Sequence, residues 1–383
     1  MATIGHLRQP EMTLAQKVVQ VNWALVLLVM AIAGFGLAML YSAANGSVEP
    51  WASRHAARFL VGLAILLGIA LVDLRFWMRW AYAIYVAALG LLIAVEVMGT
   101  IGMGARRWID LGVFQLQPSE VMKIALVLAL ARYFHERGVD DVRRIGTLVP
   151  PLLMVAVPVA LVLRQPDLGT AVMLVGGGGA LLFVAGVRLW KFAVLAVVGV
   201  AAVPVVWEVL HDYQRQRVLT FLDPENDPLG AGYHILQSKI ALGSGGLTGK
   251  GFLAGTQSHL SFLPERHTDF VFTMLAEELG LVGAAALLLL YTLLFAYGFA
   301  IALRARSHFG RLVAMGVTTT VFLYVFINVA MVTGLIPVVG VPLPLISYGG
   351  TAMMTVMVAI GLLSCVYVHR DVTIGRHPDL PGD

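Results

Sequence analysis

Charged residues and cysteine are both scarce in this chain of 383 residues. Asp, Glu, Lys and Arg make up only 13% of the residues and hydrophobic residues 59%, whereas soluble domains carry about 25% charged residues. This shortage of charge excludes an ordinary soluble domain. The single cysteine, Cys365, excludes an intramolecular disulfide, so a metal site would have to be built from His and carboxylates.

A convincing internal repeat is also lacking, so the sequence gives no support to an inverted-repeat transporter. Apolar runs of about 20 residues, the length needed to cross a bilayer as a helix, recur along the chain. We therefore predict an all-α polytopic membrane protein, a single membrane domain over residues 1–383, with about ten transmembrane helices. The predicted spans lie near residues 20–41, 57–73, 80–98, 118–133, 148–164, 169–186, 190–207, 270–302, 312–335 and 347–368.

The orientation of the chain follows from the Lys and Arg residues of its short loops, because these favour the cytoplasmic side. With the N-terminus inside, the inner side carries Arg8, Lys17, Arg75, Arg79, Arg132, Arg137, Arg143, Arg144, Arg188, Lys191, Arg304, Arg306, Arg311, Arg370 and Arg376. The outer short loops carry Arg54, Arg58, Arg106, Arg107 and Arg164. This bias predicts cytoplasmic tails at residues 1–19 and 369–383. It also accounts for most of the net charge of +4, so we do not predict nucleic-acid binding.

One large polar loop, residues 208–269, is predicted outside the membrane between spans 7 and 8. Its stretch Tyr233–Leu242 has Leu236 and Ile240 on one helical face, which predicts a short helix on the outer membrane surface. The following sequence GSGGLTGKG, Gly243–Gly251, resembles a phosphate-binding loop but lacks its first glycine and its final Ser or Thr. We predict a flexible, glycine-hinged loop there.

Ionisable residues crowd the mouth of the eighth span, in the stretch PERHTDFVFTMLAEELG at Pro264–Gly280. They are Glu265, Arg266, His267, Asp269, Glu277 and Glu278. An ionisable group in a span costs roughly 2.5–3.5 kcal/mol at a helix centre and marks a functional site by default. Glu277 and Glu278 lie roughly 80° and 180° around the helix from Asp269. We therefore expect at least one of them to have a structural partner instead.

Polar residues at other outer helix mouths have both a structural and a functional interpretation. Glu120 and Lys123, three residues apart, either form a self-neutralising ion pair or face a polar cavity. Arg106, with Arg107 and Trp108, either anchors the chain at the interface or binds phosphate while Trp108 stacks on a sugar.

Two aspartates precede predicted spans and suit helix N-caps. Capping is a sufficient explanation for Asp167 or Asp269 taken singly. Together with the other outer polar residues, however, they predict a polar cavity that faces one compartment. The three-proline segment Ile336–Ala352 cannot be a regular helix throughout, and we expect it to form a wall of the same cavity.

These motifs resemble the SEDS (shape, elongation, division, sporulation) family, and its rod-shape or elongation branch more than its division branch. The matching segments are RRWIDLG (Arg106–Gly112), LQPSEVMKIALVLALARYF (Leu116–Phe134), RQPDLGTA (Arg164–Ala171), DPENDPLGAGYHILQSKIALGSGGLTGKG (Asp223–Gly251), FLPERHTDFVFTMLAEELG (Phe262–Gly280) and PLISYGG (Pro344–Gly350). They cover nearly the whole chain in the same order.

The resemblance implies a peptidoglycan glycosyltransferase of the bacterial inner membrane that polymerises lipid II, the undecaprenyl-diphosphate disaccharide-pentapeptide, on the outer face. The implied partners are a class B penicillin-binding protein, which supplies the transpeptidase, and other proteins of the elongation machinery. The essential aspartate of the family's HTDF motif corresponds to Asp269. A flippase for lipid II and a noncatalytic scaffold for the penicillin-binding protein are the alternatives.

Inverting transfer from an α-linked diphosphate to a sugar hydroxyl needs one base, and the expected base is Asp269. We expect Arg106, Lys123 and Lys239 to hold the diphosphate, Trp108 to contact a sugar or the lipid, and Glu265 and His267 to tune Asp269. Glu120 and Asp167 would order Lys123 or hold a divalent cation, Mg²⁺ or Mn²⁺, with the diphosphate. The sequence does not decide whether a metal is required.

Overall fold

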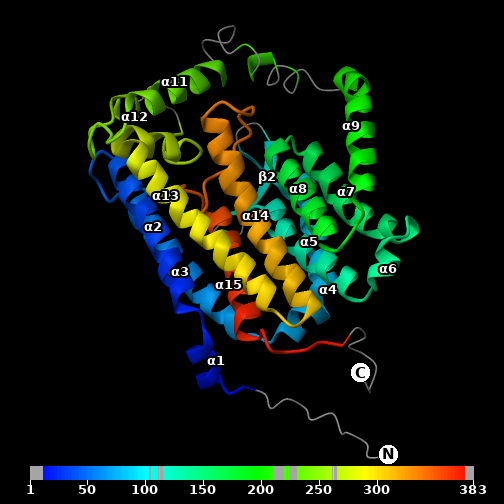
Figure 1. The fold of residues 1–383 in the computed structure, drawn as a ribbon. Helices are drawn as coiled ribbons and strands as arrows, with labels where there is room; N and C mark the ends of the chain where they lie inside the picture. Colours follow the sequence, from blue (N-terminus) through cyan, green and yellow to red (C-terminus); the bar gives the residue numbers. More distant parts are fainter. Residues whose placement is uncertain are drawn as a thin grey trace, which may run out of the picture.

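The protein is a bundle of long helices (Figure 1) in a computed structural model that describes residues 12–102, 105–110, 112, 115–209, 215, 219–221, 223, 231–260, 262 and 265–375. The first half of the bundle contains α1 (Leu14–Gln20), α2 (Trp23–Ala43), α3 (Ala52–Leu71), α4 (Leu74–Met98), α5 (Pro118–His135), α6 (Val139–Val142), the 3-10 turn η1 (Gly146–Leu148) and α7 (Val149–Arg164). The remaining helices are α8 (Leu168–Val184), α9 (Leu189–Val209), α11 (Ala231–Ser244), α12 (Thr256–His259), α13 (Val271–Arg304), α14 (His308–Val332) and α15 (Gly350–Val368).

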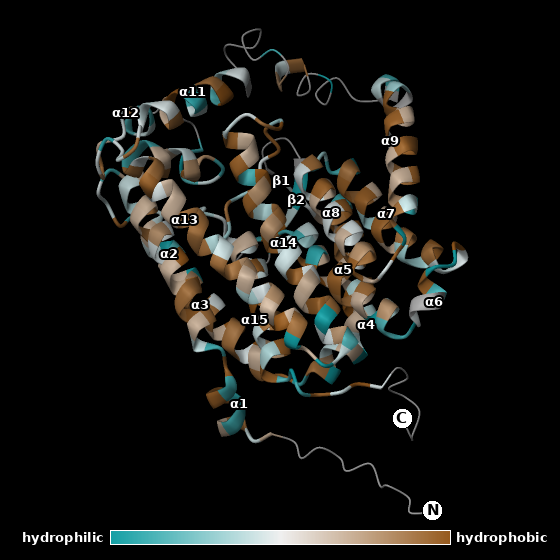
Figure 2. Cartoon of the chain, viewed as in Figure 1, coloured by the Kyte–Doolittle hydropathy of each residue, from teal (hydrophilic) through white to brown (hydrophobic). Residues whose placement is uncertain are grey.

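Several of these helices have the length and apolarity of membrane spans. Within the described residues seven segments qualify, namely α2, α3, α4, η1 with α7, α13, α14 and α15, and α8 and α9 are shorter apolar helices. Hydrophobic residues follow the long helices, and hydrophilic ones gather at their ends (Figure 2). The chain is therefore a multi-pass membrane protein, as predicted. Each predicted span overlaps one helix, while the total of ten crossings stays a prediction.

The interior of the bundle is formed by α5, α14 and α15. Nearly every residue of α5 is buried, which is the pattern of a helix surrounded by other helices. The glycines of α8 permit close packing beside them: a Cβ on Gly176 would stand 3.0 Å from Leu323 of α14, and one on Gly178 would stand 2.6 Å from Val155 of α7. Small residues at these two positions therefore let α14 and α7 approach α8 closely.

A three-stranded antiparallel sheet precedes α5, so the prediction of an all-α chain is incomplete. It consists of β1 (Thr100–Gly102), β2 (Ala105–Asp110) and β3 (Gln115–Leu116). β2 pairs with both neighbours, with Ile101 opposite Arg106 and Ile109 opposite Leu116. The RRWIDLG stretch, interpreted above as a loop, is thus mostly the central strand of this sheet.

Helix α13 is broken one third of the way along. Gly280 has φ 66° and ψ −164°, a conformation open essentially to glycine alone. The backbone of the glycine-rich loop enters this break: Leu281 N–H donates to Gly246 O (2.9 Å), and Gly251 N–H donates to Glu278 O (3.0 Å). A Cβ on Gly249 would stand 2.1 Å from Glu278 O. The predicted flexible hinge is therefore wrong for this part of the loop, which is fastened to α13.

The helix predicted at Tyr233–Leu242 is confirmed as α11, which packs on α13 and α14, while its position on the outer membrane surface stays a prediction. Its buried face carries Ile235, Ser238 and Ala241. Ser238 Oγ lies 2.8 Å from Thr273 Oγ1 of α13 and donates to Val332 O of α14 at 2.7 Å. Ile240, by contrast, is half exposed. The DPENDP stretch is outside the described residues except for Asp223.

The segment between α14 and α15 is irregular, as its prolines predicted. Residues 333–349 contain turns and extended backbone, and the segment lines a small pocket beside Tyr324 of α14. Both described ends of the chain lie at one end of the bundle, and α11 and α12 lie at the other (Figure 1). The 1–11 and 376–383 parts of the predicted tails are outside the described residues.

Candidate active site

Asp269 lies in the turn that leads into α13. The N-cap of α13 is Phe270, and no side chain accepts a hydrogen bond there. The capping interpretation is therefore wrong for Asp269. Among the described residues its carboxylate has no hydrogen-bond partner, and Oδ2 points toward Gly340, 3.4 Å from where a Cβ would stand. A carboxylate in this state is free to take a proton from a ligand.

The electrostatic surroundings of Asp269 suit a base. Burial, assisted by the negative charge of Glu265, raises the pKa of Asp269 from an ordinary 3.8 to about 6. A base works best when its pKa lies near the operating pH and it is still mainly ionised. Asp269 meets both conditions at neutral pH.

The backbone of the turn is held through the carbonyl groups of three successive residues, 267–269, each of which accepts a hydrogen bond. Tyr348 N–H donates to His267 O at 2.8 Å, and Ser347 Oγ donates to Thr268 O at 2.6 Å. Asn328 Nδ2 of α14 donates to Asp269 O at 2.9 Å. The irregular 333–349 segment and α14 thus fix the turn from two sides, which confirms that the proline-rich segment forms a wall at Asp269.

His267 belongs to a stack of rings beside this turn. Its imidazole lies against Trp51, with centroids 4.5 Å apart and an interplanar angle of 11°, and 6.0 Å from the ring of Tyr348. The guanidinium of Arg58 lies 4.8 Å from the centroid of the Tyr348 ring. Burial lowers the pKa of His267, against the opposing charge of Glu265, so the imidazole is neutral at pH 7.

Glu265 lies at the exposed start of the same turn. Its backbone has φ 52°, and its Oε2 accepts a hydrogen bond from Thr268 Oγ1 at 2.8 Å. Its side chain therefore contacts Thr268 within the turn, and its negative charge helps to raise the pKa of Asp269. The structure thus places both predicted tuning residues, Glu265 and His267, in the turn that carries Asp269.

Asp167 has the capping role that Asp269 lacks. As N-cap of α8 it accepts a hydrogen bond from Thr170 N–H at 3.1 Å, and its Oδ2 accepts one from Thr170 Oγ1 at 2.9 Å. A Cβ on Gly169, beside it, would stand 2.8 Å from Val339 O. The N-terminus of α8 therefore packs on the segment that faces Asp269, and Asp167 is explained by capping.

Glu120 and Lys123 form the predicted ion pair, with Lys123 Nζ 2.7 Å from Glu120 Oε1. Both are buried, at 4% and 3% exposure. Tyr324 completes the cluster, since its hydroxyl donates to Glu120 Oε2 and accepts from Lys123 Nζ. Lys123 is therefore no free cation in this structure, which corrects its expected role as a direct ligand of the diphosphate.

The other predicted cations lie toward the end of the bundle that carries α11 (Figure 1). Arg106 is exposed, and its Nη1 donates a long hydrogen bond to Glu96 O at 3.4 Å. Arg107 is the one that anchors the sheet, because its guanidinium donates to Gln165 O at 2.9 Å and to Pro166 O at 2.5 Å. Trp108, its neighbour on β2, is partly exposed. Arg106 and Trp108 thus keep free surface for a ligand.

Lys239 of α11 is exposed above the end of α14. Its Nζ lies 2.8 Å from the point where a Cβ on Gly334 would stand, directly after the α14 C-terminus. A cation there is stabilised by the helix dipole, so its position has a structural explanation as well as the predicted one.

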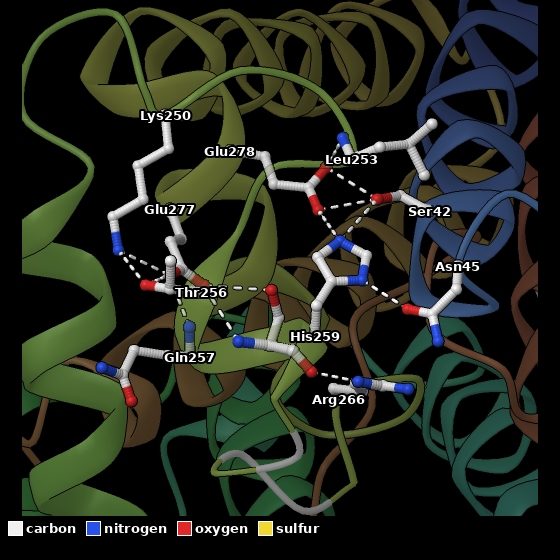
Figure 3. Close-up of polar contacts among 11 residues, drawn as sticks. Ser42, Asn45, Lys250, Leu253, Thr256, Gln257, His259, Arg266, Glu277 and Glu278 are labelled. Atoms are coloured by element: carbon white, nitrogen blue, oxygen red, sulfur yellow. Dashed lines mark hydrogen bonds and ion pairs between the residues drawn. The ribbon is translucent and has the colours of Figure 1, made fainter.

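Glu277 and Glu278 both have structural roles, and Figure 3 shows the different sets of residues that they contact. Glu277 accepts hydrogen bonds from Lys250 Nζ (2.8 Å), Gln257 N–H (2.8 Å) and Ser258 N–H (3.1 Å). The two carboxylates are fully buried. The expectation that at least one of them has a structural partner is confirmed for each.

Glu278 reaches in the other direction, toward α2 and α12. It accepts a hydrogen bond from Ser42 Oγ at 2.6 Å, and its Oε1 lies 2.9 Å from His259 Nε2. His259 Nδ1 in turn lies 2.5 Å from Asn45 Oδ1. Together the two glutamates fasten the loop at residues 245–259 to α13 and α2.

Several residues of the site escaped the sequence analysis. Trp51, Tyr324, Asn328 and Ser347 were not singled out, and Arg58 was counted only as a loop charge. One signal was available: Tyr324 and Asn328 are polar-ended residues one helical turn apart in an otherwise apolar span. Within the described residues no group of three or more His, Cys, Asp or Glu side chains could hold a metal ion, so the expected donors Glu120 and Asp167 form no such cluster.

Comparisons with known proteins agree over nearly the whole chain. The family model for FtsW, RodA and SpoVE, described as "Cell cycle protein", matches residues 22–372. Peptidoglycan glycosyltransferase MrdB of Escherichia coli (strain K12) is 47% identical over 354 residues, which cover 92% of this chain and 95% of that protein. Stage V sporulation protein E of Bacillus subtilis (strain 168) is 37% identical over 352 residues, covering 88% and 94%.

Solved structures give the same result. A chain from a structure described as "Structural coordination of polymerization and crosslinking by a peptidoglycan synthase complex" has a TM-score of 0.80 at 36% identity, covering 91% of this chain and 98% of that one. Thermus thermophilus Rod shape determining protein RodA has a TM-score of 0.69 at 32% identity, covering 91% and 97%.

Proposed function

Because this chain belongs to the FtsW, RodA and SpoVE family and is a peptidoglycan glycosyltransferase, we propose that it polymerises lipid II with Asp269 as the general base. The observation that carries this assignment is the unpaired carboxylate of Asp269, whose pKa is raised to about 6, at the outer mouth of α13. The catalysed step extends glycan strands during cell elongation.

The proposed step needs one proton acceptor. Asp269 removes the proton from the 4-hydroxyl of the acceptor sugar while the hydroxyl oxygen bonds to C1 of the donor sugar. The bond between C1 and the diphosphate oxygen breaks, and undecaprenyl diphosphate leaves with the electron pair. The anomeric centre is inverted, so no covalent enzyme intermediate is needed, and general-base assistance contributes about 10²–10⁴ in rate.

The leaving diphosphate needs positive charge more than a proton. The exposed Arg106 and Lys239 keep their predicted role, and Arg58 joins them, because it lies over Tyr348 beside the Asp269 turn. Trp108 offers a face to a sugar or to the lipid. Lys123 and Glu120 act from inside the bundle, through Tyr324. Mg²⁺ or Mn²⁺ would have to bind largely through the diphosphate itself, and no step here depends on it.

The same comparisons support a proposed cellular setting. We place the chain in the bacterial inner membrane with both termini cytoplasmic and Asp269 outside. Its similarity to a chain of a peptidoglycan synthase complex supports a class B penicillin-binding protein as partner, alongside other elongation proteins. The flippase alternative has less support, because the ionisable pair inside the bundle is closed on itself by Tyr324.

The test is glycan-strand synthesis from lipid II by the purified chain with its cognate transpeptidase, in the presence of moenomycin to silence other glycosyltransferases. Asp269→Asn keeps the shape of the side chain and removes the base, so synthesis should fall by ~10² or more. Asp371→Asn, an exposed aspartate at the opposite end, should leave synthesis unchanged. Strand formation by folded, partner-bound Asp269→Asn at the wild-type rate would sink the assignment.

A further inference from the structure

Asn328 is a fully buried amide in the membrane-spanning helix α14, with 0% exposure. Its Nδ2 donates to Asp269 O at 2.9 Å and to Val341 O at 2.7 Å. Two carbonyl acceptors fix the orientation of the amide, because the Oδ1 atom would repel both. The Oδ1 atom itself is buried and has no hydrogen-bond partner among the described residues, so the side chain is held through its two donated hydrogen bonds.

The two carbonyls that Asn328 holds belong to opposite walls of the space around the Asp269 carboxylate. Asp269 O is the carbonyl of the residue that carries the carboxylate. Val341 follows Gly340, the residue toward which Asp269 Oδ2 points. One amide group therefore sets the separation between the carboxylate and the wall that it faces.

The same face of α14 continues inward to the buried ion pair. Tyr324 lies four residues before Asn328, one helical turn away on the same face, and binds both Glu120 and Lys123. α14 is buried along much of its length. A helix fixed by charged hydrogen bonds one turn below is a rigid support for the amide above.

The turn at Asp269 has other supports that do not depend on Asn328. Ser347 Oγ holds Thr268 O and Tyr348 N–H holds His267 O, and both donors lie on the 333–349 segment. Loss of the amide should therefore release the Asp269 end of the turn while its His267 end stays in place.

We propose that Asn328 is a positioning residue for Asp269: it bridges the catalytic turn to the opposite wall and holds the carboxylate at the distance that proton transfer requires. This inference rests on the proposed role of Asp269 as the base. A displacement of about 1 Å is enough to cost a factor of about 10² in rate. Because Asn328 is buried and donates its hydrogen bonds to backbone carbonyls and not to a ligand, its loss should lower kcat and leave KM unchanged.

The experiment compares Asn328→Leu, similar in size but without hydrogen bonds, and Asn328→Asp, identical in shape, in the complex with the transpeptidase. Both should lower kcat for lipid II polymerisation by about 10- to 100-fold with KM within about twofold. The deficit of Asn328→Asp should grow as pH rises, because an ionised carboxylate donates no hydrogen bond and repels both carbonyls. A role in packing alone would not produce that pH dependence.

Thr318→Val is the matched control, since Thr318 is a buried residue of the same helix whose hydroxyl donates within the helix to Ala314 O (2.7 Å). It should retain wild-type kcat. A raised KM with normal kcat, or losses equal to those of Thr318→Val in folded protein, would overturn the inference. Asp269→Asn, assayed in parallel, separates the two hypotheses: an active Asp269→Asn refutes the base, whereas an inactive one with normal Asn328 variants refutes only the positioning role.

Discussion

At the scale of single residues, two aspartates with similar sequence settings have different roles. Both precede an apolar helix, and the sequence allowed capping for each. Asp167 caps α8 through Thr170, whereas the N-cap position of α13 falls on Phe270 and leaves the Asp269 carboxylate free. A shift of one residue in the start of a helix thus separates a structural carboxylate from a chemical one.

The raised pKa of Asp269 predicts an acid limb in the pH profile of kcat/KM. The base must be ionised, so activity should fall as pH drops through about 6. Glu265→Gln keeps an acceptor for Thr268 Oγ1 but removes a negative charge that raises this pKa. The limb should therefore move to lower pH, measured as initial polymerisation rates between pH 5 and 8.

Glu265→Asp is the control, because it keeps the charge and should keep the limb near its wild-type pH. An unmoved limb in Glu265→Gln, with a lower plateau rate, would mean that Glu265 acts by contact and not by charge.

At the scale of elements, the break in α13 is a docking point for the loop at residues 245–259. The non-helical backbone of Gly280 interrupts the hydrogen bonds of the helix. Gly246 O accepts from Leu281 N–H, and Gly251 N–H donates to Glu278 O. Glu277 and Glu278 then receive the side chains and N–H groups of the loop (Figure 3). The glycine-rich sequence is therefore explained by close backbone approach and not by mobility.

Removing one partner of the buried Glu277 should destabilise this docking. Lys250, only a quarter exposed at its side chain, supplies one charged hydrogen bond of several, so Lys250→Met should cost about 1.5–3 kcal/mol. Glu277→Ala removes the acceptor for all of them and should cost more, about 3–5 kcal/mol. Thermal unfolding and limited proteolysis within residues 245–259 measure both effects.

Lys191→Met serves as the control, since Lys191 lies on α9, away from the loop, where its Nζ donates to Arg143 O and lies 6.0 Å from the centroid of the Trp190 ring. Equal protease resistance of wild type and Glu277→Ala within the loop would show that the glutamate does not hold it.

At the scale of the whole molecule, the described chain termini lie at one end of the bundle and the candidate active site lies toward the other. The described termini lie at one end, with α11 and α12 at the other (Figure 1). Described basic residues that favour the cytoplasm lie near the described termini: Arg306 N–H donates to Arg370 O, and Lys17 Nζ donates to Leu71 O. Asp269, the half-buried Arg58 and the exposed cations Arg106 and Lys239 lie toward the end that carries α11 and α12. We propose that this end faces outside, as the proposed chemistry requires.

Single-cysteine labelling tests this orientation. Cys365 is buried and should not react with a membrane-impermeant maleimide. In intact cells with a permeable outer membrane, Ala254→Cys should be labelled, because Ala254 is exposed in the outer loop. Arg306→Cys, at the exposed turn between α13 and α14, should be labelled only after the inner membrane is opened; the reverse pattern would invert the topology.

The sequence by itself determined the membrane class, the approximate positions of the long apolar helices and the family, and it singled out Asp269 as the candidate base. These features are local: apolar length, basic loops and short motifs are visible in consecutive residues. It also gave the Glu120–Lys123 pair, because residues three apart on a helix must lie on one face.

Only the tertiary structure decided which polar groups meet across the bundle. Glu278 meets Ser42, Tyr324 meets Glu120, and Asn328 meets Asp269, over sequence separations that no periodicity encodes. Burial then fixed their roles, because a polar group removed from water must find a partner wherever the fold provides one. Lys123 is paired with Glu120 and Tyr324 inside the bundle and is not available to bind the diphosphate directly. The carboxylate of Asp269 has no hydrogen-bond partner among the described residues and is available for chemistry.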